Sequence, residues 1–342
     1  MSNTPLVSVC VASYNHGRFL PAMLDGLLSQ TFRDFEIVVV DDGSTDNSMQ
    51  VLKAYADRNP EIMRVYTHPG GQNRGVSATV NLGFEKSCGK YWCMHDSDDL
   101  SYPDRLARQA AFLESHPDVG WVYGVADPID GNGAHLDGRF GSDLSSCSDL
   151  VERLIWDNPI AAVTTIIRRD CALRIGLWDE AVIYSDWEYW IRLASHYPPA
   201  FIPGSVIKYR VHGGNTSLGV SREARLDRLL QVMKAAREKA DSTGGLVARP
   251  RTKAQLDFRK AGLSSEMGDF ESCRHELRSM FDSDPTLRFN PKPISHWLCR
   301  QPGRRLALGV IREFGSRPRW AANPSFMSTL VGIFLYRRLR RT

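Results

Sequence analysis

The first hundred residues alternate between apolar, strand-like runs and segments with helical spacing, and this alternation constrains the fold most. The strand-like runs are Leu6–Ala12, Phe35–Val40, Met63–Thr67 and Tyr91–Met94, and the helical segments between them are Phe19–Leu28, Ser48–Arg58 and Gly75–Ser87. Alternating strands and helices form a parallel sheet covered by helices, which binds ligands outside the carboxyl ends of its strands. We therefore expect an α/β fold with a Rossmann-like, mostly parallel sheet.

The remainder of the chain divides into two regions. Residues 100–215 mix strand and helix patterns and include Gly131–Ser148, a polar segment that we expect to be a mobile specificity loop. After Ser221 the sequence becomes helix-rich and Arg-rich, without strand alternation. We therefore expect a catalytic domain over residues 1–220 and a helical C-terminal region over residues 221–342.

Composition excludes several classes of protein. A net charge of +4 on 342 residues is too small to indicate a nucleic-acid-binding protein. The seven cysteines include no Cys-x-x-Cys pair, which favours a reducing cytoplasm over a disulfide scaffold. No signal peptide is apparent, and the longest apolar tract, near Phe326–Tyr336, is about half of the ~20 residues that a spanning helix needs. The expected location is cytoplasmic.

A cluster of three aspartates, Asp96, Asp98 and Asp99, follows the strand-like run Tyr91–Met94. Carboxylates this dense repel one another unless water or a cation lies among them. Asp-x-Asp at a strand end offers the hard oxygen ligands that Mg²⁺ or Mn²⁺ prefers. A solvated acidic turn is the alternative explanation, so the metal hypothesis depends on the other motifs.

Two further turns carry candidate ligand-binding residues. Asp41-Asp42-Gly43-Ser44 comes after the clearest strand, and Asp42 either binds a nucleotide or forms an Asx turn that caps the next helix. Arg74 precedes a helix whose N-terminal N–H groups favour anionic oxygens. It is therefore either a diphosphate ligand or an ordinary surface arginine.

Taken in order, the motifs of this chain resemble those of family 2 glycosyltransferases, the inverting, nucleotide-sugar-dependent GT-A enzymes. The motifs are Val7–Asn15, Glu36–Asp46, Asn73–Gly75, Asp96–Asp99, Pro103–Leu106, Gly176–Glu180, Ser185–Leu193 and Tyr209–Ser217. The resemblance implies a GT-A fold with a helical C-terminal extension. It also implies transfer of a sugar from a nucleotide-diphosphate sugar to a carbohydrate or lipid-linked acceptor, in bacterial surface-polysaccharide biosynthesis.

On the donor side, the resemblance implies a role for each motif. Asp98 and His212 would bind the metal, Mg²⁺ or Mn²⁺, and Asp96 would contact the nucleotide ribose or the metal. Asp99 would hydrogen-bond the sugar. The residues implied in nucleotide binding are Ser13, Tyr14, Asp42 and Arg74.

On the acceptor side, the resemblance implies that Asp186 is the general base. Ser185 stands where the family pattern has an acid, and Glu188 is the alternative base. Trp187 and Trp190 lie beside the implied base and are the candidates for contact with an acceptor sugar, although core packing would also explain them.

Two other functions and one further partner remain open. A nucleotidyltransferase would show a Gly-rich, basic loop near its N-terminus, and this sequence has none. A sugar-nucleotide-binding protein without transferase activity is left open by Ser185. The tract Phe326–Tyr336, followed by Arg337–Arg341, predicts either a helix on an anionic membrane, peripheral to its inner face, or a helix docked on the catalytic domain.

Overall fold

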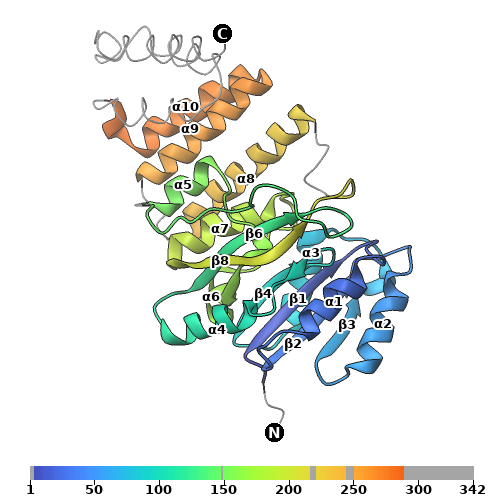
Figure 1. Cartoon of the computed structure of the whole chain (residues 1–342). Helices are drawn as coiled ribbons and strands as arrows, with labels where there is room; N and C mark the ends of the chain where they lie inside the picture. Colours follow the sequence, from blue (N-terminus) through green and yellow to red (C-terminus); the bar gives the residue numbers. More distant parts are fainter. Residues whose placement is uncertain (1–3, 148, 216–220, 244–249, 289–342) are drawn as a thin grey trace. The chain divides into compact units, whose positions relative to one another are not determined.

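The computed structural model describes residues 4–147, 149–215, 221–243 and 250–288 (Figure 1). These residues belong to two compact units that interleave along the sequence. The first unit comprises Met1–Leu150, Asn158–Ala181 and His196–Gly219, and the second comprises Val151–Asp157, Val182–Ser195 and the chain from Val220 onward. The functional boundary expected at residue 220 stays a prediction.

An eight-stranded sheet, in the order β3-β2-β1-β4-β7-β6-β8-β5, forms the centre of the first unit. Its strands are β1 (Val7–Ser13), β2 (Phe35–Asp41), β3 (Met63–Thr67), β4 (Tyr91–Asp96), β5 (Leu100–Ser101), β6 (Trp121–Ile129), β7 (Ile166–Arg168) and β8 (Pro199–Arg210). Strands β1 to β4 pair in parallel, as do β6 and β8, whereas β7 and β5 pair antiparallel with their neighbours. The predicted mostly parallel α/β sheet is confirmed.

Helices cover the sheet because alternate strand residues supply apolar side chains to opposite faces. The helices of this unit are α1 (Leu20–Leu28), α2 (Ser48–Arg58), α3 (Val76–Lys86), α4 (Arg105–Ser115) and α6 (Arg169–Ile175), with short 3-10 turns at Pro69–Gly71 and Ala162–Thr164. Val9 of β1 joins the core that includes Leu24 of α1. Cys10, the next residue, faces Gly83 of α3. A Cβ added at Gly83 would lie 3.3 Å from the Cβ of Cys10.

The strand register gathers the expected functional turns along one edge of the sheet. Ser13, the last residue of β1, pairs with Asp41 of β2, and Ala12 pairs with Asp96 of β4. The segments that follow β1, β2 and β4 therefore begin side by side. This is the edge at which a parallel α/β sheet binds its ligands.

The segment Gly131–Ser148, expected to be mobile, is tied to β6 in its described part. Phe140 forms an isolated β-bridge with Ala126, and the Leu144 N–H donates to the Tyr123 hydroxyl at 3.0 Å. The sequence did not show these contacts because the partners lie 14 or more residues away in the chain.

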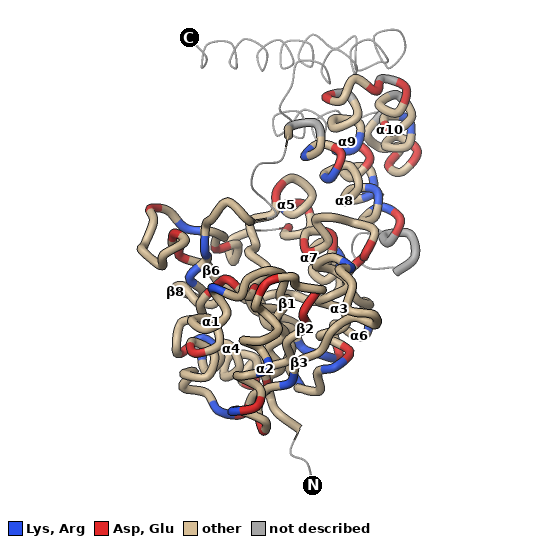
Figure 2. Tube along the Cα trace, turned by 90° about the vertical axis from the view of Figure 1, so that its right-hand side faces the viewer, with Lys and Arg blue, Asp and Glu red and all other residues tan. Residues whose placement is uncertain are grey.

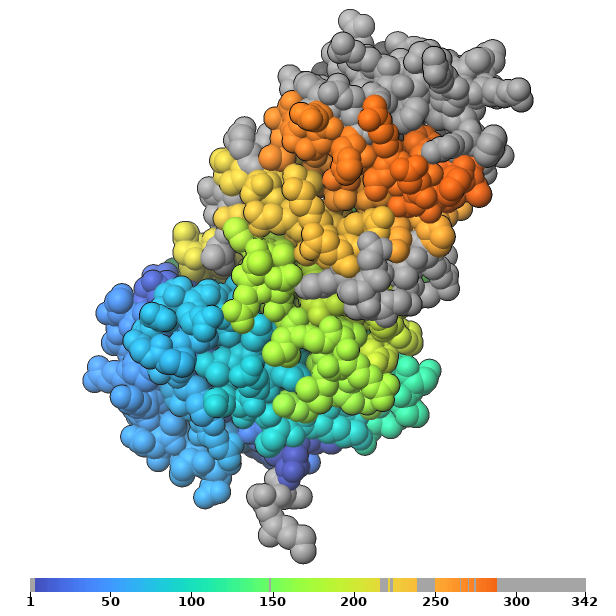
Figure 3. Space-filling model, turned by 180° about the vertical axis from the view of Figure 1, so that it is seen from behind, coloured from blue at the N-terminus to red at the C-terminus, as the bar shows by residue number. Residues whose placement is uncertain are grey.

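The second unit is helical. It contains α5 (Leu150–Trp156), α7 (Ser185–His196), α8 (Arg222–Thr243), α9 (Pro250–Met267) and α10 (Phe270–Ser283), and a 3-10 turn at Pro285–Arg288 follows. Helices α9 and α10 lie against each other, as the orange side chains in Figure 3 show. The helical extension predicted beyond residue 221 is confirmed over the described residues.

Buried charges connect the helices of this unit. Asp257 of α9 accepts hydrogen bonds from Arg237 of α8 at 3.1 Å and from Ser279 of α10 at 2.8 Å. Lys260 lies 3.2 Å from Asp257 and 2.6 Å from Glu276. Figure 2 shows the interspersed acidic and basic residues along these helices.

The described residues contain no helix that is both long and apolar enough to cross a membrane. The predicted membrane-binding tract Phe326–Arg341 lies outside the described residues. Each cysteine within the described ranges is a free thiol.

Candidate functional site

The acidic turn after β4 is mostly buried rather than solvated. The exposed fraction is 5% for Asp98 and 1% for Asp99, and Asp96 is half-buried. One oxygen of Asp99 accepts the Arg210 backbone N–H at 2.8 Å, and its other oxygen is buried without a hydrogen-bond partner. Burial and the charges of Asp96 and Asp98 raise the pKa of Asp99 well above its usual range. Ionising all three carboxylates of this turn is therefore unfavourable, and a bound cation would reduce that cost.

Arg210, at the end of β8, fixes the position of this turn. Its Nε donates to the Asp98 carbonyl at 2.7 Å, and its Nη1 donates to the carbonyls of Asp130 and Gly131. The guanidinium also lies 4.9 Å from the ring centroid of Phe19. Arg210 thus ties the acidic turn, the end of β6 and the start of α1 together.

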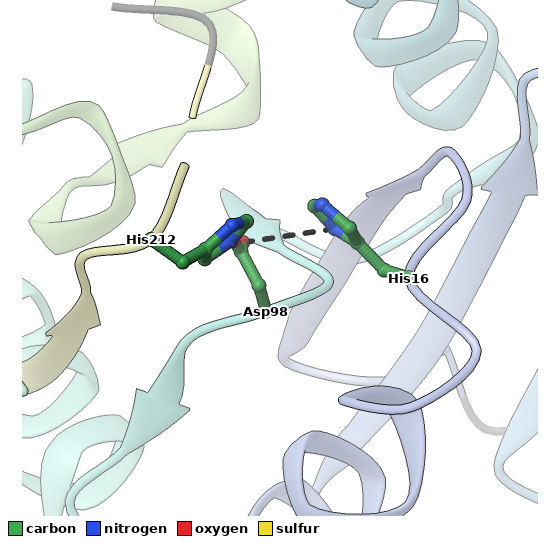
Figure 4. A group of neighbouring side chains, drawn as sticks. All are labelled: His16, Asp98 and His212. Carbon is green, nitrogen blue, oxygen red and sulfur yellow. Dashed lines mark hydrogen bonds and ion pairs between the residues drawn. The ribbon is translucent and has the colours of Figure 1, made fainter. Parts of the chain in front are cut away.

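A second feature is a cluster of two histidines around the Asp98 carboxylate (Figure 4). His212 Nε2 lies 2.8 Å from Asp98 Oδ2, and His16 Nδ1 lies 3.9 Å from Asp98 Oδ1. His16 comes from the turn after β1 and His212 from the segment after β8, so three distant parts of the sequence meet here. Burial lowers the pKa of His16, although the Asp98 charge opposes that effect.

The donor set of this cluster fits a divalent cation. One ligand atom from each of His16, Asp98 and His212 can be chosen so that all lie within 4.8 Å of one another, and the same holds for Asp96, Asp98 and Asp99. Carboxylate oxygens suit Mg²⁺ and Mn²⁺, and imidazole nitrogens suit first-row transition metals.

The hydrogen bonds of His212 add one requirement for a cation at Nε2. His212 Nδ1 accepts the Gly214 N–H at 3.1 Å, so the neutral imidazole carries its proton on Nε2. A cation at Nε2 would displace this proton to Nδ1, and Gly214 would then have to shift.

The two carboxylates of the turn after β2 accept hydrogen bonds from neighbouring backbone groups. Both oxygens of Asp42 accept backbone N–H groups, from Arg74 at 2.7 Å and from Gly75 at 2.9 Å. Asp41 accepts from the Ser44 backbone and hydroxyl. Asp42 therefore holds the N-terminal end of α3 at the sheet edge, and its direct contact with a nucleotide stays a prediction.

The other residues expected to bind the nucleotide differ in exposure. Ser13 is buried, and its hydroxyl has no hydrogen-bond partner. Tyr14 is 45% exposed, so a face of its ring is accessible. The Arg74 guanidinium is half-exposed and lies 3.5 Å from Glu180.

The residues expected to act on the acceptor all lie on α7, in the second unit. Asp186 is half-buried in the first helical turn, where the helix N-terminus favours negative charge. Glu188 is fully buried and paired with Arg192 at 2.8 Å. The indoles of Trp187 and Trp190 are buried, and Trp187 donates to the Leu154 carbonyl. A contact between either indole and an acceptor stays a prediction.

Comparison with known proteins identifies the first unit. Residues 8–175 match the sequence model of glycosyl transferase family 2. These residues of the chain belong to this family. An uncharacterized glycosyltransferase of Haemophilus influenzae is 27% identical over 235 residues, which are 64% of this chain and 69% of that protein. The amylovoran biosynthesis glycosyltransferase AmsE of Erwinia amylovora is 28% identical over 208 residues, 60% of this chain and 76% of that protein.

Solved structures confirm the GT-A fold of the chain. S. aureus TarS 1-349, crystallised with UDP-GlcNAc, is similar with a TM-score of 0.62 and 18% identity, over 92% of this chain and 93% of that chain. The mannosyltransferase PcManGT of Pyrobaculum calidifontis, in complex with GDP-Man and Mn²⁺, gives a TM-score of 0.53 and 17% identity, over 97% of this chain and 87% of that chain.

Sequence reasoning missed one residue of the site. No motif of the sequence predicts a role for His16, although the structure places it beside Asp98. The only signal in the sequence was its place directly after Asn15, in the turn that ends the first strand.

Proposed function

We propose that this chain is an inverting glycosyltransferase that moves one sugar from a nucleotide-diphosphate sugar to a carbohydrate or lipid-linked acceptor. The observation that carries the proposal is the Asp98–His212 pair at the carboxyl edge of the sheet, with Asp98 inside the stretch 8–175 that matches family 2. The ligands of TarS and PcManGT support a nucleotide-sugar donor, and the name of AmsE supports a role in polysaccharide biosynthesis.

On the donor side, Asp98 and His212 would hold Mg²⁺ or Mn²⁺. The bound cation supplies positive charge that stabilises the departing diphosphate by several kcal/mol. Asp96 contacts the ribose or the cation, and Asp99 offers its unpartnered oxygen to a sugar hydroxyl. Tyr14 supplies an exposed ring on which the base can stack.

On the acceptor side, Asp186 takes the proton of the acceptor hydroxyl. The acceptor oxygen attacks the anomeric carbon from the face opposite the diphosphate, the bond between that carbon and the diphosphate oxygen breaks, and the proton stays on the Asp186 carboxylate. Asp186 suits this role better than Glu188, because the Glu188 carboxylate is fully buried and paired with Arg192.

A panel of UDP-, GDP-, dTDP- and CDP-sugars with Mn²⁺ tests the proposal. We expect one donor to raise the melting temperature, since a ligand that binds only the native state stabilises it, and to release its nucleoside diphosphate on turnover. Binding without turnover, even with a panel of acceptors, would favour a silent sugar-nucleotide-binding protein. Release of pyrophosphate from a nucleoside triphosphate and a sugar phosphate would favour a nucleotidyltransferase.

Lipid-linked acceptors would place the enzyme in the cytoplasm, peripherally at the inner face of the membrane. The basic tract Arg337–Arg341 supports this proposal through its attraction to anionic lipid headgroups.

A further inference from the structure

We propose that His16 is a third protein ligand of the divalent cation, together with Asp98 and His212. The inference rests on the proposed function, because it concerns the cation of the same site. It adds a residue from the turn after β1 to a pair formed by the segments after β4 and β8.

The geometry of the cluster supports a direct role for His16. In Figure 4 the His16 ring points toward Asp98 from the side opposite His212. His16 Nδ1 lies 3.9 Å from Asp98 Oδ1 and 2.8 Å from the Ser97 hydroxyl. The His16 and His212 ring centroids are 5.6 Å apart. A cation beside Asp98 would therefore meet a ring nitrogen from each side.

The turn that carries His16 is built to hold it. The Asn15 backbone has a φ of 53°, the left-handed region, and the Asn15 side chain accepts the Thr45 N–H at 2.8 Å. The His16 N–H donates to the Ser48 hydroxyl at 3.1 Å, and the Gly17 N–H donates to Asp46 at 2.9 Å. Because both sides of His16 are fixed by the segment after β2, its ring is presented with little freedom to lose on binding.

A second constraint comes from the residue that follows His16. A Cβ added at Gly17 would lie 2.0 Å from the Asn47 side-chain oxygen. The turn therefore packs directly against the start of α2, so its position is set by the fold.

Two imidazoles and one carboxylate change which cation the site prefers. Mg²⁺ favours oxygen ligands and keeps several waters, whereas imidazole suits transition metals. We therefore expect the full-length protein to bind Mn²⁺ or Co²⁺ more tightly than Mg²⁺, and His16 to account for part of that preference.

Two measurements with Mn²⁺ alone test this assignment in the full-length protein. Electron paramagnetic resonance of free Mn²⁺ gives the affinity, and pulsed measurements detect nitrogen bound to the ion. Removing a residue that only orients a metal ligand typically lowers metal affinity by about 10–100-fold. Removing a direct ligand should cost at least as much, so we expect His16→Ala to weaken Mn²⁺ binding by at least about 10-fold. The wild type should show two bound imidazoles and His16→Ala one. His116→Gln, on an exposed histidine at the end of α4, should leave both measurements unchanged.

Two further variants separate the possible outcomes. Ser97→Ala removes the hydrogen bond to His16 and should preserve both imidazole signals, so a loss equal to that of His16→Ala would overturn the inference. One bound imidazole in the wild type would also overturn it, whether or not His16→Ala folds. Asp98→Asn should abolish binding, and Mn²⁺ binding that survives in Asp98→Asn would refute the proposed metal site itself. If only Asp98→Asn loses the ion and His16→Ala binds normally, His16 is not a ligand and the proposed function stands.

Discussion

Neutralising Glu188 on α7 separates a structural role for this residue from a catalytic one. The side chains of Glu188 and Arg192 are 0% and 6% exposed. Arg192 donates to both Glu188 oxygens, through Nε at 3.0 Å and Nη2 at 2.8 Å. The Arg192 guanidinium also lies 5.1 Å from the ring centroid of Tyr189, which is on the same helix. Glu188→Gln would remove the Glu188 charge from beside the buried guanidinium.

The expected destabilisation follows from this burial. Removing one partner of a buried ion pair costs about 3–5 kcal/mol, and the remaining amide oxygen of Gln can still accept a hydrogen bond, so we expect about 3 kcal/mol. For domains of 150–250 residues, 1 kcal/mol lowers the melting temperature by about 2–4 °C. The midpoint of Glu188→Gln should therefore fall by roughly 6–12 °C.

Thermal unfolding followed by circular dichroism measures this shift, and donor turnover is measured well below the midpoint of the variant. The double variant Glu188→Leu/Arg192→Met should recover most of the stability, because apolar replacement of a buried pair is often neutral or stabilising. Turnover should persist in the folded fraction of Glu188→Gln. A variant that keeps the wild-type midpoint but loses turnover would refute the structural role and favour Glu188 as the base.

Three further variants and a salt titration test the fold and the membrane hypothesis. Gly43→Ala should lower the free energy of unfolding in urea by at least about 1 kcal/mol, since φ is 75° and the added Cβ would lie 2.7 Å from the Gly71 carbonyl. Gly26→Ala, inside α1 with open space around it, should instead stabilise by about 0.4–1 kcal/mol. Removing the residues after Pro324 should abolish co-sedimentation with anionic vesicles, and so should 1 M salt, which shortens the Debye length to about 3 Å. Unfolding of the truncated protein would show that this tract belongs to the core.

Local patterns predicted the first half of the sheet closely. The apolar run expected at Phe35–Val40 is β2, Phe35–Asp41, and the helical spacing expected over Ser48–Arg58 is α2. In contrast, β7 is only three residues long and inserts antiparallel between β4 and β6. Its position depends on pairing between distant segments, which no local periodicity reveals.

The candidate site was predictable only in part for the same reason. Family resemblance suggested both Asp98 and His212, which are 114 positions apart, as metal ligands. No such resemblance named His16, whose hydrogen-bond partner Ser97 lies 81 positions away. Asp42 was expected to contact a nucleotide, but a sequence cannot show that both of its oxygens accept N–H groups from a loop about thirty residues later.

Turnover by Asp186→Asn, measured together with donor affinity, tests the central claim most directly. If Asp186 is the general base for transfer from a nucleotide sugar, turnover should fall by about 10²–10⁴-fold. The dissociation constant for the donor with Mn²⁺ and the melting temperature should stay near their wild-type values, because the carboxylate acts on the acceptor. Wild-type turnover in Asp186→Asn would contradict the account.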